Sequence, residues 1–371
     1  MESEDLVRLY ENVLKRERRI FRVNENNIRT AIQDMKDVYM PEGKEWHSST
    51  DLTIANYDNA AHRCAYIHKY ASCHTGLLIE MLQRAIADDP SVFLDLFDGT
   101  SFLNLCCIGG GPGTDIIGFL TVFSWYFGKF KCEATVLDYS LGWKKTFNCI
   151  VKELRNGKSY SDLSYSVSPG RFHYDYIGTD LLSSMTPDVN KAVGSADFLT
   201  MIKFISAAAR HDTNVMIKKI FNSMKPGAVL LFIDNAGGGF HQLVMDVAQG
   251  CNLETVFGPL RHELYQNDVF RVKRFGYMSQ SETKVTVHMW RKLRSGKITL
   301  RSNVKKGMAS NRLAQPDRLL WGDILNTEAG IYFAARQEYA ETRNSYRYVV
   351  DDSENLVEDD SDENFDCCVI A

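Results

Sequence analysis

Residues 102–114 read FLNLCCIGGGPGT, an apolar run that ends abruptly in a cluster of glycines. The run is typical of a buried β-strand, and the glycines let the backbone turn sharply and approach a ligand, because they carry no Cβ. A long apolar segment follows, and then ATVLDYS, which contains Asp138. A helix after such a loop points its unpaired N–H groups towards a ligand. This order predicts a nucleotide-type site at the carboxyl edge of a parallel sheet.

The spacing of the glycines narrows the kind of ligand. A dinucleotide fingerprint requires G-x-G-x-x-G, and its last position here is Thr114. The residues directly after the loop are not Gly-Lys-Ser or Gly-Lys-Thr, which excludes a P-loop here. The pattern that fits is G-x-G-x-G at Gly109, Gly111 and Gly113, and it resembles motif I of the class I S-adenosylmethionine-dependent methyltransferases. A glycine-rich turn that binds nothing is the alternative interpretation.

The resemblance implies S-adenosylmethionine as the cofactor. A carboxylate at the end of the second strand can accept hydrogen bonds from both ribose hydroxyls, so Asp138 is the expected ribose contact. Asp180 matches the acidic position that contacts the adenine amino group in this family. Each acid has a turn or capping role as its alternative. The sequence departs from the family at Cys107, which stands where an acid usually helps to hold the amino-acid end of the cofactor.

Residues 96–293 alternate between predicted strands and helices, which indicates a parallel sheet with helices on both faces. We expect strands at 102–108, 134–138, within 170–182, and at 196–202, 228–235, 253–257 and 284–290. The stretch VTVHMW alternates as a half-exposed antiparallel strand should, and a closing antiparallel strand is typical of the methyltransferase fold. The predicted fold is therefore a doubly wound, mostly parallel, seven-stranded Rossmann-like sheet.

Residues 1–95 predict an N-terminal helical cap, with one helical stretch over about 56–87. In proteins of this fold such a cap often closes over the cofactor, so Arg63, Tyr66 and Tyr70 are candidates to line the site; a packing face is the alternative. Cys64 and His68 have a spacing that could share a metal ion, but no matching pair occurs elsewhere, so we expect no metal site.

Composition excludes several classes of protein. The 371 residues carry a net charge of −4, which gives no global electrostatic reason to bind nucleic acid. Nine cysteines without a C-x-x-C motif or a secretory signal favour free thiols in a reducing, cytoplasmic compartment. The longest uncharged stretch near the loop, 116–128, is shorter than the about 20 residues of a spanning helix.

The C-terminal part has two compositional segments. Residues 291–318 hold nine Lys or Arg and one acid, which indicates either a patch for phosphates or anionic lipid or a solvated connector. Residues 294–349 are expected to pack on the core as an extension. Residues 350–371 are expected to be a disordered acidic tail. The tail ends in a C-a-a-X pattern that resembles a farnesylation signal on Cys368, with Cys367 as a candidate for palmitoylation.

Methyl transfer from a sulfonium mostly requires alignment of the acceptor, so the sequence names no catalytic residue. The candidates by position are Tyr139, Lys203, Asp234, Asn235 and His241, with Asp234 and Asn235 expected on the acceptor side. No D/N-P-P-Y/F or Pro-Cys motif occurs, and the fifth strand does not end in Lys, so nucleic-acid acceptors are disfavoured.

The leading hypothesis is a class I methyltransferase that acts on a protein, lipid-linked or small-molecule acceptor and is held at a membrane by its tail. The alternative is a catalytically inactive, prenylated interaction module with the same fold. Cys107 favours the alternative, whereas the intact glycine loop together with Asp138 favours the enzyme.

Overall fold

The computed structural model describes residues 1–39, 55–97, 101–156, 160–183, 185–209 and 212–294. The predicted C-terminal extension, the acidic tail and Cys368 lie outside the described residues, as does most of the basic segment. No helix in the described ranges is long and apolar enough to cross a membrane.

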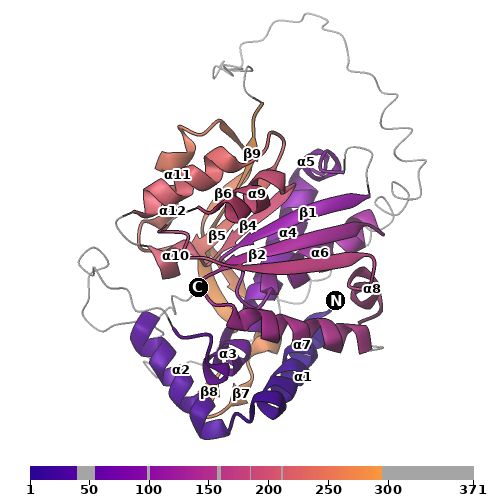
Figure 1. Cartoon of the computed structure of the whole chain (residues 1–371), viewed down its shortest axis with the longest axis vertical. Coiled ribbons are helices and arrows are strands. Elements are labelled where there is room, and N and C mark those ends of the chain that lie inside the picture. Colours follow the sequence, from indigo (N-terminus) through magenta and orange to yellow (C-terminus); the bar gives the residue numbers. More distant parts are fainter. Residues whose placement is uncertain (40–54, 98–100, 157–159, 184, 210–211, 295–371) are drawn as a thin grey trace, which may run out of the picture.

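A seven-stranded sheet forms the centre of the molecule (Figure 1). Its strands are β1 (Phe102–Ile108), β2 (Lys131–Asp138), β3 (Phe172–Gly178), β4 (Phe198–Ile202), β5 (Val229–Asn235), β6 (Leu253–Gln266) and β9 (Glu282–Lys292). Their order is β3-β2-β1-β4-β5-β9-β6, and β9 is antiparallel to both of its neighbours. The predicted doubly wound fold with a closing antiparallel strand is confirmed.

The order of the strands reverses between the parallel neighbours β1 and β4. After β1 the chain continues to β2 on one side, and after β4 it continues to β5 on the other. In open α/β sheets a ligand crevice forms at this point, outside the carboxyl ends of the strands. The glycine loop follows β1 and Asp138 ends β2, so both lie at this edge. The strand order alone therefore predicts the position of the site.

Helices cover both faces of the sheet, because the apolar residues of β1 alternate between them. Leu105 and Cys107 pack with the N-terminal helices and α6 (Thr114–Phe127), whereas Cys106 and Ile108 face the second cluster. The helices that contribute to this second cluster are α9 (Pro187–Ser195), α11 (Thr213–Ser223) and α12 (Phe240–Ala248). Short helices α5 (Ser91–Leu94), α8 (Ser161–Ser166) and α10 (Ile205–Ala208) occupy connections.

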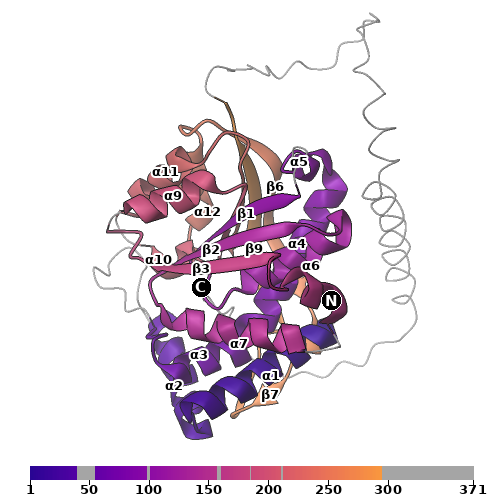
Figure 2. The same ribbon diagram turned by 45° about the vertical axis from the view of Figure 1, so that its right-hand side comes forward.

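The N-terminal helices share one hydrophobic cluster with the first face of the sheet. They are α1 (Ser3–Phe21), α2 (Glu25–Tyr39), α3 (Ala60–Tyr66), the π-helical turn η1 (Ile67–Ala71) and α4 (Ser72–Asp88). Helix α1 lies beside α7 (Gly142–Asn156), as Figures 1 and 2 both show. The helical cap exists, but its single predicted helix over 56–87 is three consecutive pieces.

Two details differ from the predicted elements. Strand β6 extends well beyond residue 257, and its pairing with β9 passes three register shifts that interrupt the apolar alternation. Bulges of this kind place extra residues against one partner, so the period-2 pattern is lost while pairing continues. A small hairpin of β7 (Lys273–Arg274) and β8 (Tyr277–Met278), which follows the single turn η3 (Asp268–Phe270), was not predicted.

Candidate active site

The glycine loop connects β1 to α6 through a tight turn. Gly109, Gly111 and Gly113 have φ angles of 65°, 49° and 82°, which L-residues with side chains rarely adopt. A Cβ at Gly109 would also lie 2.2 Å from the ring of Phe204, so the two segments meet only because this residue is glycine. The loop is thus held in one conformation by the residues that surround it.

Asp138 joins the second strand to the glycine loop. Its Oδ2 accepts a hydrogen bond from the Gly111 N–H at 2.9 Å, and its Oδ1 accepts one from the Ser140 N–H at 3.0 Å. Burial raises the pKa of Asp138 to about 6, the two N–H donors oppose this rise, and the nearby Asp58 carboxylate adds to it. The side chain is therefore a carboxylate above about pH 6, with lone pairs left for a further ligand.

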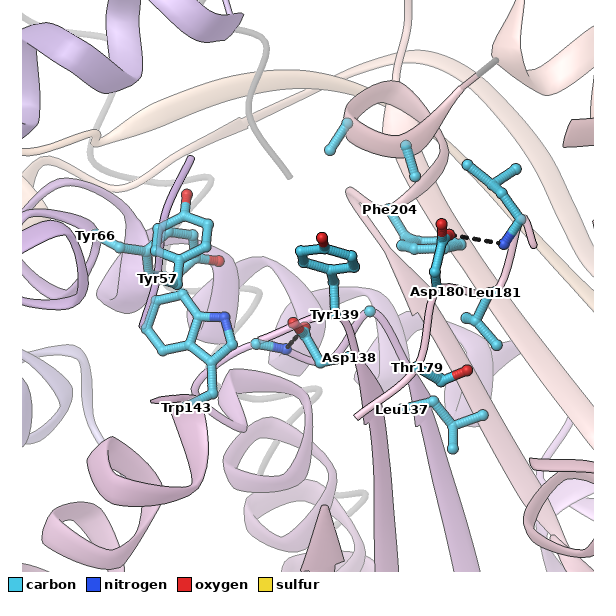
Figure 3. A pocket seen from close by; sticks show the side chains of 15 residues that line it. Tyr57, Tyr66, Leu137, Asp138, Tyr139, Trp143, Thr179, Asp180, Leu181 and Phe204 are labelled. Atoms are coloured by element: carbon cyan, nitrogen blue, oxygen red, sulfur yellow. Dashed lines mark hydrogen bonds between the residues drawn. The ribbon is translucent and has the colours of Figure 1, made fainter. Parts of the chain in front are cut away.

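A cavity opens above these residues at the carboxyl edge of the sheet (Figure 3). The space between its walls is about 710 Å³ when the open mouth is included. Gly109, Gly111 and Asp138 lie in its wall, together with Asp180. The cavity therefore contains four of the five residues expected to bind the cofactor; the fifth, Gly113, packs against Phe147 just behind the loop.

The two ends of the cavity differ in character (Figure 3). Tyr57, Tyr66 and Trp143 gather at one end, where the ring centroid of Trp143 lies 4.4 Å from that of Tyr57 and 5.2 Å from that of Tyr66. The other end contains the chain after β3, where Asp180 accepts a hydrogen bond from the Leu182 N–H at 3.1 Å. Tyr139 stands between the two ends and is 65% exposed. The cavity is thus elongated, with an acid near its middle.

The cap is fastened to the turn that follows Asp138. The Asp58 carboxylate accepts hydrogen bonds from the Ser140 hydroxyl at 2.7 Å and from the Gly142 N–H at 2.9 Å. Arg63 donates from Nη1 to the backbone carbonyls of Tyr57 and Asp58, at 3.0 and 2.9 Å. These bonds fix the segment that carries Tyr57 into the cavity wall.

Two of the three cap residues expected to line the site do not line this cavity. Arg63 is 1% exposed and forms an ion pair with the buried Glu17 at 2.6 Å, so its side chain lies behind the cavity wall and not in it. Tyr70, also 1% exposed, stacks on His74. Tyr66 does lie in the wall, and its hydroxyl is 3.0 Å from Nδ1 of His74.

The polar residues at the ends of β4 and β5 form a separate buried cluster. Asp234 accepts hydrogen bonds from the N–H groups of Ser206 and Asn235, at 3.1 and 2.7 Å. Lys203 donates from Nζ to Oδ1 of Asn235 at 2.6 Å and to the Thr283 hydroxyl at 2.8 Å. None of these side chains lines the cavity. The expected acceptor-side pair, Asp234 and Asn235, is therefore engaged within the protein.

The remaining candidate for catalysis lies elsewhere. His241 is 3.2 Å from His288; both imidazoles are buried, and neither lines the cavity. Burial lowers the pKa of His241, and it lowers the pKa of His288 to about 3. Both rings are therefore neutral near pH 7. Of the five positional candidates, only Tyr139 lines the cavity.

An unexpected buried acid lies below the glycine loop. Asp115 is 4% exposed, and its Oδ2 accepts a hydrogen bond from the Thr200 hydroxyl at 2.7 Å. Burial raises its pKa to about 7. Its charge acts on Cys107, whose pKa burial also raises. Position 107 therefore lacks its usual acid, but an acid from the first turn of α6 lies close to it.

Within the described ranges, no group of three or more His, Cys, Asp or Glu side chains is arranged to hold a metal ion. His68 instead places Nε2 3.0 Å from the carbonyl oxygen of Tyr277, and Cys64 is fully buried.

A family model described as "Putative SAM-dependent methyltransferase" matches residues 43–249, more than half of the chain. Comparison with curated protein sequences gives no match.

Many solved structures are similar in fold. An O-methyltransferase family protein from Burkholderia thailandensis is 12% identical, with 73% of this chain and 72% of that chain covered and a TM-score of 0.39. The N-methyltransferase NodS from Bradyrhizobium japonicum, in complex with S-adenosyl-L-homocysteine, is 12% identical, with 58% and 98% covered and a TM-score of 0.31. A SAM-dependent methyltransferase from Methanosarcina mazei is 13% identical, with 52% and 94% covered and a TM-score of 0.32.

Proposed function

Because the chain belongs to this family of SAM-dependent methyltransferases, with S-adenosylmethionine as the cofactor, we propose that the cavity described above is its cofactor site. The observation that carries the proposal is the position of Asp138. Its carboxylate bridges the glycine loop and the β2–α7 turn, and it lies in the wall of the cavity at the carboxyl edge of the sheet.

Along the cavity, successive residues suit the ribose, the adenine and the amino-acid end of this cofactor. Asp138 uses one lone pair on each oxygen for the N–H groups, so both oxygens can also accept from ribose hydroxyls. Asp180 is suited to the adenine amino group, and the exposed ring of Tyr139 offers a stacking surface for the base. The amino-acid end would then lie by Gly111 and the aromatic end of the cavity.

The protein's contribution to the chemistry is mainly alignment. Bound S-adenosylmethionine supplies an electrophilic methyl group, and a rigid cavity that orients an acceptor towards it can contribute about 7–11 kcal/mol. Tyr57, Tyr66 and Trp143 pack against one another, so they form a stiff, largely apolar wall. Such a wall excludes water and leaves no charged side chain to act as a base at that end.

We propose a protein, lipid-linked or small-molecule acceptor, in preference to nucleic acid. The support is the missing nucleic-acid methyltransferase motifs and the negative net charge. The alternative function is a catalytically inactive interaction module. Cys107 at the position of the usual acid supports that alternative, whereas the glycine loop together with Asp138 at the cavity supports the enzyme.

We also propose that Cys368 is prenylated and holds the enzyme at a membrane from the cytoplasm. This proposal rests on the sequence CVIA alone, and it requires Ala371 to be the terminal residue in the cell.

Calorimetric titration with S-adenosylmethionine and S-adenosylhomocysteine tests the cofactor site. Asp138→Ala should weaken binding about ten- to a hundredfold, since a hydrogen bond to a charged group contributes about 1.5–3 kcal/mol. Asp175→Ala is the matched control, because that carboxylate is 66% exposed and pairs with Lys144 at the surface. Absence of binding by the wild type would refute the enzyme, and equal binding by Asp138→Ala would refute the assignment of the ribose contact.

A further inference from the structure

The second half of α1 is strongly basic. Residues 14–22 read LKRERRIFR, with five basic residues and one acid. The acid, Glu17, is fully buried and paired with Arg63 at 2.6 Å, so it does not neutralise the surface. Glu153 and Glu25 pair with Arg16 and Arg18, which leaves Lys15, Arg19 and Arg22 as the unpaired positive charges of residues 14–22 in the described structure.

Helix α7 extends this charged surface, because it lies against α1 (Figure 2). Glu153 of α7 accepts hydrogen bonds from Asn12 at 2.9 Å and from Arg16 at 3.1 Å, and Thr146 donates to Glu17 at 2.8 Å. These contacts hold the two helices side by side as one two-helix surface.

Five exposed residues of the two helices form what we call the basic face: Lys15, Arg19, Arg22, Lys145 and Lys152. On α1, Lys15 and Arg19 are four residues apart, so they share one side of the helix. Arg22 follows directly as the residue that ends the helix. Lys145 reaches to 5.9 Å from the ring of Phe21 on α1, and the charges of Lys152 and Arg16 both act on Cys149. In the part of the chain that the structure describes, none of the five forms an ion pair.

An apolar side chain accompanies these charges. Ile20 lies between Arg19 and the end of α1 and is 52% exposed. A basic helical surface with an exposed aliphatic residue is suited to an anionic lipid surface, where the charges meet headgroups and the side chain enters the interface.

We propose that the basic face docks the protein on an anionic membrane. Each Lys or Arg near such a surface strengthens binding roughly fivefold, and the attraction declines over a Debye length of about 10 Å at 0.1 M salt. The positive surface is local, since the whole chain has a net charge of −4.

The same face fits a nucleic acid less well. Single strands are bound by exposed aromatic rings on which bases stack, and no exposed aromatic residue occurs on α1 or α7. The nearest ring, Phe21, is half-buried, and it is covered by the guanidinium of Arg63 at 5.0 Å and by Lys145.

Docking through this face would bring the cavity close to the lipid. Helix α7 begins at Gly142, and Trp143 in its first turn lines the aromatic end of the cavity. A lipid-linked acceptor would then reach that end from the membrane. The docking itself requires neither the cofactor nor turnover, so vesicle binding can be tested independently of the proposed methyl transfer.

Co-sedimentation with vesicles tests the proposal. The full chain is produced in bacteria, which do not prenylate it, and is mixed with vesicles of phosphatidylserine and phosphatidylcholine or of phosphatidylcholine alone. We expect binding to the anionic vesicles only, and loss of that binding as salt increases. Replacing Lys15, Arg19 and Lys152 by Gln should weaken binding roughly a hundredfold.

The matched control replaces Lys191, Lys218 and Lys219 by Gln. These residues are exposed on α9 and α11, away from α1 and α7 (Figure 1), and their loss changes the net charge equally. We expect this control to bind like the wild type. Absence of binding at low salt, or equal losses in both variants, would overturn the proposal. An RNA oligomer that binds through the basic face while the vesicles do not would also overturn it.

Discussion

Gly142→Ala tests how closely the cap approaches the turn that carries Asp138. A Cβ at Gly142 would lie 2.4 Å from the carbonyl oxygen of Tyr57 and 2.9 Å from Cα of Asp58. Both are backbone atoms, so they cannot rotate away as the end of a long side chain could. The substitution must therefore push the cap segment and the β2–α7 turn apart.

Three contributions set the size of the effect. Alanine is favoured over glycine inside a helix by about 1 kcal/mol, which would stabilise α7 if the position were open. Overpacking of this kind costs about 1–3 kcal/mol. Displacing Asp58 also weakens its hydrogen bonds to Ser140 and Gly142, which contribute about 1.5–3 kcal/mol for a charged acceptor. The expected net decrease in the free energy of unfolding is about 2–4 kcal/mol.

Urea denaturation measures the stability, and titration with S-adenosylmethionine on the same samples measures the cofactor affinity. We expect both to decrease, because Tyr57 lines the cavity and moves with Asp58. Gly237→Ala is the control, since it is exposed near the same edge and a Cβ there meets nothing within 4 Å. A stabilised or unchanged Gly142→Ala protein would refute the close contact and with it the role of the cap in the cavity wall.

Three further predictions concern ionisable groups and the tail. Because the carboxylate form of Asp138 is needed to accept from ribose, cofactor affinity should decrease below its pKa of about 6, and titrations between pH 5 and 8 that show no change would contradict this. In the cofactor-free protein the same group affects stability in the opposite direction. Because burial raises the pKa of Asp138, its protonated form favours the folded state, and this contribution to the free energy of unfolding is lost as pH rises through about 6. Arg63→Met should lower the free energy of unfolding by about 3–5 kcal/mol, because Glu17 is left buried without its ion-pair partner. The control Arg16→Met removes a half-buried surface ion pair and should cost less than about 1 kcal/mol. Equal losses in the two variants would contradict the stabilising role of the buried pair. Mass spectrometry of the C-terminus from eukaryotic cells should find a prenyl group on Cys368, and an unmodified terminus would remove that proposal.

Most of the fold could be predicted because the buried strands are continuous apolar runs. β1 spans the predicted 102–108, and β5 agrees within one residue with 228–235. The π-helical turn η1 could not be predicted, because it changes the hydrogen bonding without changing the helical spacing of the apolar residues. The length of β6 was missed because its bulges leave no regular alternation of apolar residues beyond residue 257.

The site was predictable where it depends on local sequence. The loop and Asp138 meet because parallel strands end at one edge, and the Gly111 N–H bond joins them. Tyr57 and Trp143 were missed, since they reach the cavity only through tertiary packing of the cap on α7. Arg63 was expected to line the cavity, but it forms an ion pair with the buried Glu17 behind the cavity wall. A buried partner far away in sequence leaves no local pattern.

The hydrophobic cluster shared by the cap and the sheet also bears on the order of folding. Residues 1–95 leave the ribosome before β1, α6 and α7, yet their apolar sides pack against these later elements. Domains that can fold alone begin to do so during synthesis; these helices lack the surface that would bury them. Residues 1–95 would therefore reach their final packing only after β1, α6 and α7 have been made, although they are synthesised earlier.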